Sequence, residues 1–171
     1  GTVNVVGGEA YVEDGDLWVR GLPVAKIGNS YYATLAEAVA AATAGQAVTL
    51  IADTTVTAMI PITKNVTIDL NGHVITDMVV GDRVFRFATA GVDLTIDGTV
   101  EGSGMTIPGE YLTSFNPSQT KYWGFVRCDF PRCSITLNGG TYSGPTQNGS
   151  MVTTRYPGAV PEDQFSSVTL N

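Results

Sequence analysis

A short motif recurs along this chain and limits what the chain can fold into. The segment Val66–Gly72 returns as Val92–Gly98 and as Cys133–Gly139, and Ser166–Asn171 begins it a fourth time. Each copy alternates apolar and polar residues and ends in Asn or Asp, followed by Gly wherever the copy is complete. Strict alternation over this length is typical of a half-buried β-strand. The motif therefore predicts one strand per copy, with one apolar face turned inward.

The copies are predicted to stack on one another with their final Asn or Asp residues in line. Their unequal spacing along the chain fits stacked coils that carry loops of different length. Asn and Gly suit the sharp turn that must follow each strand, and stacked Asn side chains can hydrogen-bond along a column. A structural ladder is the favoured interpretation of this column over a metal or catalytic role. The predicted inward columns are Val66/Val92/Cys133/Ser166, Ile68/Leu94/Ile135/Val168 and Leu70/Ile96/Leu137/Leu170, and the predicted turn ladder is Asn71, Asp97, Asn138 and Asn171.

One helix is predicted, over residues 34–44. Thr34 is expected to be its N-cap, Glu37 completes a capping box, and Gly45 is expected to be its C-cap. The Ala-rich apolar face of this helix suits close packing on the open end of the coil. Residues 1–33 are predicted to form strands and a hairpin that lead into this cap. Residues 34–171 then form the helix and the coils as one continuous domain, which stops in the middle of a copy, as a piece of a longer exported protein would.

The opening of the coil resembles a known family. Tyr32–Val39, Gly45 and Val48–Leu50 are similar to the N-terminal cap and first strand of pectin-lyase-like right-handed β-helix proteins, and pectin methylesterases have a similar opening. The longer run from Ala25–Gly28 through Val66–Gly72 resembles a module of large surface proteins of Gram-positive gut bacteria. The resemblance implies an all-β fold, a right-handed single-stranded parallel β-helix of a few coils with a short N-terminal capping α-helix. It also implies an extracellular or cell-surface location.

Composition argues against several classes of partner. The formal net charge is −7, and the nine basic residues are scattered along the chain, so nucleic acid and anionic membranes are poor partners. No apolar run approaches the length of a membrane span, so no membrane insertion is expected in this segment.

Two arginines are candidates for ligand binding. Arg127 aligns with Arg86 on the next coil, with Arg155 as a possible neighbour. Two guanidinium groups on one face suit the carboxylate of a uronic or sialic acid. The alternative, which is favoured, is that Asp82 and Asp129 pair with them.

The long insertions between copies carry aromatic residues, on which sugars stack. Trp123 is the best single candidate for a ligand platform, with Tyr122 beside it and Tyr111 in the same insertion. The alternative is that these rings anchor the loops to the scaffold.

No catalytic residue, cofactor or metal site is predicted. In the predicted alignment no two carboxylates share an outward column, so the acid/base pattern of uronate-acting β-helix enzymes is not met. His73, the only histidine, is expected to be a surface turn residue. Cys128 and Cys133 fall on apolar positions and are favoured as buried free thiols, although an exported location also permits a disulfide.

The sequence therefore favours a non-catalytic cell-surface module, which serves adhesion or binds a host or dietary glycan or a surface protein through loops. The alternative is a fragment of a carbohydrate-active lyase or esterase whose catalytic coils are absent or degenerate. A structural spacer without any ligand is a third possibility.

Overall fold

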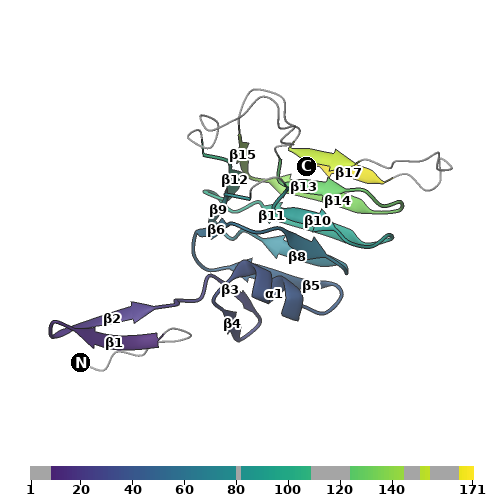
Figure 1. Ribbon diagram of the computed structural model, residues 1–171. Helices are drawn as coiled ribbons and strands as arrows, with labels where there is room; N and C mark the ends of the chain where they lie inside the picture. The colour runs from purple at the N-terminus through teal and green to yellow at the C-terminus, as the bar shows by residue number, and fades with distance from the viewer. Residues whose placement is uncertain (1–8, 80–81, 109–123, 145–150, 155–165) are drawn as a thin grey trace.

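The computed structural model describes residues 9–79, 82–108, 124–144, 151–154 and 166–171. These residues are mostly β-strand, with one short helix among them (Figure 1). Most strands form three mainly parallel sheets, which rise together from the end covered by the helix. Two further strands form a separate hairpin.

The largest sheet has seven strands, and two further sheets have four each. The spatial order of the strands in the large sheet is β17 (Ser167–Leu170), β14 (Ser134–Gly139), β11 (Asp93–Gly98), β8 (Val66–Asp69), β5 (Gln46–Leu50), β3 (Ala25–Ile27) and β4 (Ser30–Tyr32). The second sheet contains β15 (Thr141–Ser143), β12 (Gly104–Thr106), β9 (Val74–Asp77) and β6 (Thr54–Val56). The third sheet contains β16 (Val152–Thr154), β13 (Val126–Cys128), β10 (Phe85–Phe87) and β7 (Ile60–Ile62).

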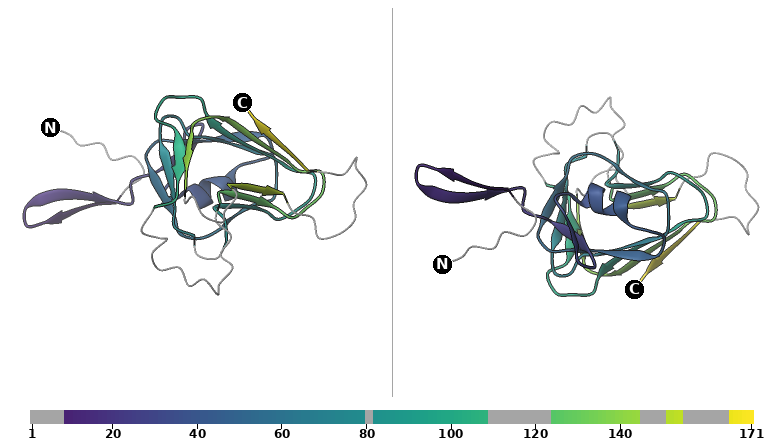
Figure 2. Two further views of the ribbon diagram at one scale, coloured as in Figure 1. Left: turned by 90° about the horizontal axis from the view of Figure 1, so that it is seen from above. Right: turned by 90° about the horizontal axis from the view of Figure 1, so that it is seen from below.

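From β5 onward the chain visits the three sheets in a fixed rotation. Each circuit adds one strand to the large sheet, one to the second and one to the third. Because every strand returns from the same direction, it pairs in parallel with the strand one circuit earlier. Seen from above or below, the circuits superimpose as a ring-like outline (Figure 2).

The interior of this outline is the hydrophobic core. Alternate residues of the large sheet point inward, so that Val66, Ile68 and Leu70 are almost fully buried while Thr67 and Asp69 are half-buried. Full burial of such a side chain contributes about 1.5–3 kcal/mol. The apolar residues of the repeat therefore face the interior, as the alternation predicted.

The register between the first two copies of the motif differs from the predicted one. Leu94 pairs with Val66 and Ile96 with Ile68, so Ile68 and Leu94 do not share a column. The later copies follow the prediction, because Leu94 pairs with Ile135 and Ile135 with Val168. The slip is two residues, so every apolar side chain still faces inward.

The turns explain this slip. In the first copy the chain turns at once, because Asn71 and Gly72 have φ values of +48° and +83°. In the second copy Asp97 and Gly98 still belong to β11, and a longer corner over 99–103 follows before β12 begins. The Asn/Asp-Gly ending therefore does not mark the same point of the circuit in each copy.

Helix α1 (Leu35–Ala41) covers the lower end of the stack, as Figure 2 shows from below. The predicted capping box is present: Thr34 Oγ1 accepts from the Glu37 amide at 3.1 Å, and Glu37 Oε2 accepts from the Thr34 amide at 3.1 Å. The C-cap is Ala42 and not Gly45, which corrects the prediction. Gly45 (φ +82°) lies in the following turn, where its amide donates to the Asn65 carbonyl at 2.7 Å.

The chain before the helix forms two hairpins. Strands β3 and β4 pair antiparallel, as predicted, and β3 continues the large sheet beside β5. Strands β1 (Glu9–Glu13) and β2 (Asp16–Arg20) form the two-stranded sheet, which stands away from the stack in Figure 1.

The upper end of the stack leaves apolar side chains exposed. Val168 and Leu170 continue the inward columns of Ile135 and Leu137. Their side chains are nevertheless 43% and 72% exposed, because among the described strands β17 pairs with β14 alone.

Candidate functional site

Arg86 and Arg127 lie side by side on neighbouring strands. Arg86 is the middle residue of β10, Arg127 is the middle residue of β13, and the two residues pair in register. Their neighbours in each strand are buried, whereas the two arginine side chains are 40% and 26% exposed. This adjacency was predicted from the alignment of the two segments.

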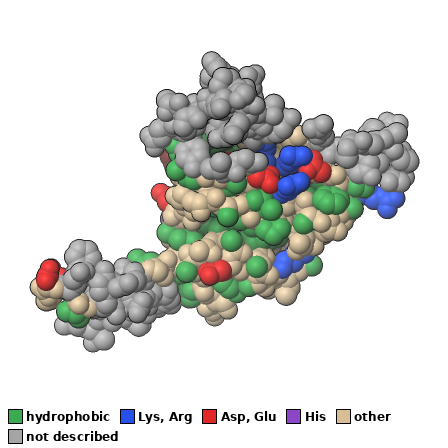
Figure 3. Space-filling view, in the orientation of Figure 1, with side chains coloured by type: hydrophobic (Ala, Val, Ile, Leu, Met, Phe, Trp, Pro, Cys, Tyr) green, Lys and Arg blue, Asp and Glu red, His purple; other side chains and the backbone are tan. Residues whose placement is uncertain are grey.

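Two aspartates hold these arginines. Arg86 Nη1 donates to Asp82 Oδ2 at 3.0 Å, and Arg86 Nη2 donates to Asp129 Oδ2 at 3.5 Å. Arg127 Nε contacts both oxygens of Asp129, at 2.9 and 2.8 Å. The two arginines therefore pair with Asp82 and Asp129, as was favoured from the sequence. Figure 3 shows these blue and red side chains gathered on the upper part of the stack.

A third arginine, Arg83, belongs to the same cluster and was missed by sequence reasoning. Its side chain is 2% exposed. Burial, and after it the positive charge of Arg127, lowers the pKa of Arg83 to about 10. No described residue accepts a hydrogen bond from its Nε or Nη1. The sequence carried no signal for this burial, since an arginine before an apolar strand is usually exposed.

Asp77 is the buried carboxyl whose negative charge does most to raise the pKa of Arg83. It ends β9, is 4% exposed, and accepts a hydrogen bond on Oδ1 from the Val79 amide at 2.8 Å. Burial raises the pKa of Asp77 to about 6, although the Val79 amide and the charge of Arg83 oppose the shift. We call Arg83, Arg86, Arg127, Asp77, Asp82 and Asp129 the arginine cluster.

The predicted turn ladder exists in part. Asp97 pairs in register with Asn138, and Asn171 Nδ2 donates to Asn138 Oδ1 at 2.8 Å. Asn71 lies outside this column, because of the two-residue slip, and its Nδ2 donates instead to the Leu50 carbonyl at 3.0 Å.

The same slip brings two carboxylates together, which corrects the expectation that no two share an outward column. Asp69 takes the place of Asn71 beside Asp97. Both carboxylates also serve the turns that follow them. Asp69 Oδ1 accepts from the Asn71 amide at 3.0 Å, and Asp97 Oδ1 accepts from the Thr99 amide at 3.1 Å.

The remaining polar candidates have local partners. His73 Nδ1 lies 3.4 Å from Asp53 Oδ1, on the turn after β8. Cys128 and Cys133 are buried free thiols, as favoured. Burial raises the pKa of the Cys128 thiol to about 12, so this thiol remains protonated at neutral pH.

The aromatic candidates Trp123, Tyr122 and Tyr111 lie outside the described residues, as does Arg155. One aromatic of the insertions is described. Tyr142 packs its ring against Phe125, with the ring centroids 6.2 Å apart. Burial, followed by the charge of Asp97, raises the pKa of Tyr142 to about 12.

Other kinds of site find less support. In the described ranges, no three His, Cys, Asp or Glu side chains are placed to hold a metal ion. A small pocket beside α1 is lined by Ala33–Ala36, Thr54–Ala58 and Ile60, none of which is charged. Within the described ranges, no helix is both long enough and apolar enough to cross a bilayer.

Comparison with known proteins adds no relative, because no family model, no curated protein and no solved structure matches this chain.

Proposed function

We propose that the described stack is a right-handed single-stranded parallel β-helix with α1 as its N-terminal cap. The support is the fixed rotation of the chain through three sheets, together with parallel pairing from one circuit to the next. Such a scaffold holds residues of successive circuits at the strand spacing of about 4.8 Å. It can therefore present a rigid row of side chains to a partner.

On this scaffold the chain acts as a non-catalytic, extracellular surface module that binds a glycan or a surface protein. The observation that carries the proposal is the arginine cluster, in which Arg86 and Arg127 share an outer face and Arg83 is buried. In a chain with a formal net charge of −7, a gathering of three arginines is a local exception. Arginine suits it, because the guanidinium group binds carboxylates with two parallel hydrogen bonds.

A glycan array with the wild-type chain tests this function. Three variants accompany it: Arg86→Gln and Arg127→Gln for the arginine cluster, and Trp123→Ala for the aromatic candidate. We expect at least one acidic glycan to bind, with a weaker signal in both arginine variants. If no glycan on the array binds the wild type, the glycan-binding function is wrong. If binding survives both arginine substitutions but not Trp123→Ala, the ligand site belongs to the insertion.

The alternative function is a carbohydrate-active lyase or esterase, and one observation favours it. Asp69 and Asp97 are neighbours on one outer face, as general acid/base chemistry requires. Asp69→Asn and Asp97→Asn should each abolish turnover of polygalacturonate or methylated pectin if this pair is catalytic. Absence of turnover in the wild-type chain removes the pair as a reaction centre. Both substitutions leave an amide oxygen for the following turn, so the fold should persist.

A further inference from the structure

Arg83 is the side chain whose surroundings are least explained. A buried charge is usually paired, because removing an ion from water is costly. Among the described residues no ion pair involves Arg83, and Nε and Nη1 lack any acceptor. The carboxylates of Asp82 and Asp129 are instead engaged by Arg86 and Arg127.

The cluster therefore holds one positive charge more than its ion pairs use. Asp77 is the remaining carboxyl that acts electrostatically on Arg83. Because burial raises the pKa of Asp77 to about 6, this carboxyl is half protonated at pH 6. Once Asp77 is protonated, the three arginines face two ionised aspartates.

The three arginines of the cluster differ in their exposure to solvent. Arg86 and Arg127 have side chains 40% and 26% exposed, whereas Arg83 is 2% exposed. A ligand would thus contact the exposed pair, Arg86 and Arg127, and the buried Arg83 would act on it through its charge. A buried charge is less screened by water and salt than an exposed one.

On the basis of the proposed binding function, we propose that the arginine cluster binds the single carboxylate of an acidic sugar. Arg86 and Arg127 contact the carboxylate, and Arg83 is a positioning residue that strengthens its binding without touching it.

The neighbouring aspartates favour a sugar acid over an acidic peptide. Asp82 and Asp129 keep acceptor capacity beside the arginines, since an ionised carboxylate accepts several hydrogen bonds. The hydroxyl groups that flank the carboxylate of a uronic acid can donate to them. An acidic peptide would bring further negative charges toward Asp82 and Asp129, and these charges would repel one another.

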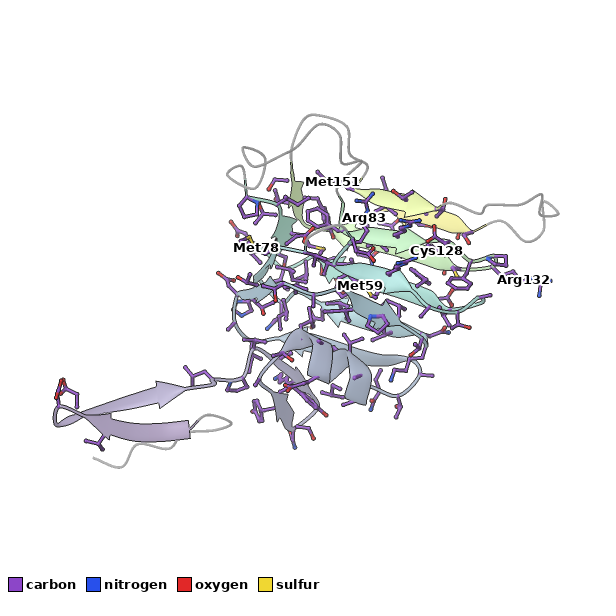
Figure 4. All side chains as sticks on the ribbon, in the orientation of Figure 1. Met59, Met78, Arg83, Cys128, Arg132 and Met151 are labelled. Carbon is purple, nitrogen blue, oxygen red and sulfur yellow. The ribbon has the colours of Figure 1, made fainter. Side chains whose placement is uncertain are left out.

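The test is a titration of the wild-type chain with sodium glucuronate at pH 6, in which the NMR chemical shifts of the arginine side chains report binding. Glucose is the neutral control ligand, and triglutamate is the peptide control. Arg83→Met removes the buried charge at similar volume, and Arg83→Lys retains it. Arg132→Met removes an exposed charge from a corner far from Arg83 in Figure 4, so it is the matched control.

We expect glucuronate to shift the arginine signals and glucose to leave them unchanged. A unit charge about 10 Å away, at an effective dielectric constant of about 20, changes affinity by roughly tenfold. Arg83→Met should therefore weaken binding by roughly tenfold, while Arg83→Lys and Arg132→Met stay near the wild type. The loss in Arg83→Met should persist in moderate salt.

Three results would overturn the inference. The first is glucuronate binding that is unaffected by Arg83→Met in a chain that melts like the wild type. The second is binding of triglutamate in place of glucuronate, which would assign the cluster to a protein partner. Both results leave the proposed binding function standing. The third is no glucuronate binding at all, in which case the glycan array decides whether the binding function fails as well.

Discussion

Gly104→Ala is the substitution that most sharply tests contact between successive circuits. Gly104 starts β12 and pairs with Thr141 of β15, one circuit later. A Cβ atom added at Gly104 would lie 2.4 Å from the Thr141 carbonyl oxygen, whereas ordinary contacts are 3.4–4 Å. The obstacle is backbone and cannot swing away as a side chain can, so β12 and β15 would have to separate by about 1 Å, the difference from an ordinary contact.

The cost follows from what that separation disrupts. Overpacking typically costs about 1–3 kcal/mol, and each backbone hydrogen bond weakened beside it about 1 kcal/mol. The amide of Thr141 donates to the Ser103 carbonyl at 3.0 Å, right beside the clash. We expect Gly104→Ala to lower the free energy of unfolding by about 3 kcal/mol. For a chain of this size the loss corresponds to a Tm lower by about 6–12 °C.

Thermal unfolding followed by circular dichroism measures this change, with Gly144→Ala as the matched control. Gly144 follows β15, and a Cβ atom there would meet only the flexible tips of Ile107 and Met151, at 3.4 and 3.7 Å. The control should therefore melt within about a degree or two of the wild type or slightly above it. A slight rise is expected because replacing Gly by Ala lowers the conformational entropy of the unfolded chain, which stabilises a protein by about 0.4–1 kcal/mol. If Gly104→Ala melts like Gly144→Ala, β12 and β15 are not in the described contact.

Three further predictions concern the cap, the buried carboxyl and the thiols. Thr34→Ala should lower the free energy of unfolding by about 1 kcal/mol, because it removes the capping box, and Thr57→Ala at an exposed position between β6 and β7 should not. Burial raises the pKa of Asp77 from 3.8 to about 6, so the stability gained from its proton is present below pH 4 and lost as the pH rises through 6. Asp77→Asn should therefore raise the Tm at pH 7.5 by a margin that closes toward pH 4, and a margin independent of pH would contradict this reasoning. Cys128 and Cys133 are buried, so a thiol reagent at pH 8 should label both rapidly only in denaturant, and rapid labelling of the native chain would show that this corner opens.

Local signals in the sequence predicted the local structure well. The capping box at Thr34 and Glu37 depends on residues three apart, and the structure contains it. The pairing of Arg86 with Arg127 followed from two similar segments with apolar neighbours on both sides. The capping box is decided within one turn of helix, whereas the arginine pairing joins residues 41 positions apart and was found because the two short segments resemble each other.

Register between distant segments was harder, because it depends on the lengths of the turns. A slip of two residues preserves the inward face, so apolar alternation alone cannot distinguish Leu94 opposite Val66 from Leu94 opposite Ile68. The deciding feature is that the chain turns at Asn71 but continues straight through Asp97. The shared Asn/Asp-Gly ending concealed this difference, and with it the neighbouring carboxylates of Asp69 and Asp97.

The candidate site was predictable only at its surface. Arg86 and Arg127 stood out as outward residues of two strands, but the burial of Arg83 and Asp77 arises from the corner between the second and third sheets. A corner has no periodic pattern, so nothing in the sequence separates a buried arginine there from an exposed one. The electrostatic character of the cluster is therefore a property of the packing.

The central claim is the pairing of circuits on all three sheets, and scalar couplings across backbone hydrogen bonds test it most directly. In NMR spectra of the labelled chain, each coupling joins an amide nitrogen to the carbonyl carbon that accepts its hydrogen. Among the couplings that the structure predicts, one from each sheet serves as the test: from Leu70 to Asp97, from Gly104 to His73 and from Ile60 to Val84. A coupling from Gly72 to Asp97 would instead support alignment on the Asn/Asp-Gly turns. Absence of the Gly104 and Ile60 couplings would contradict the rotation of the chain through three sheets.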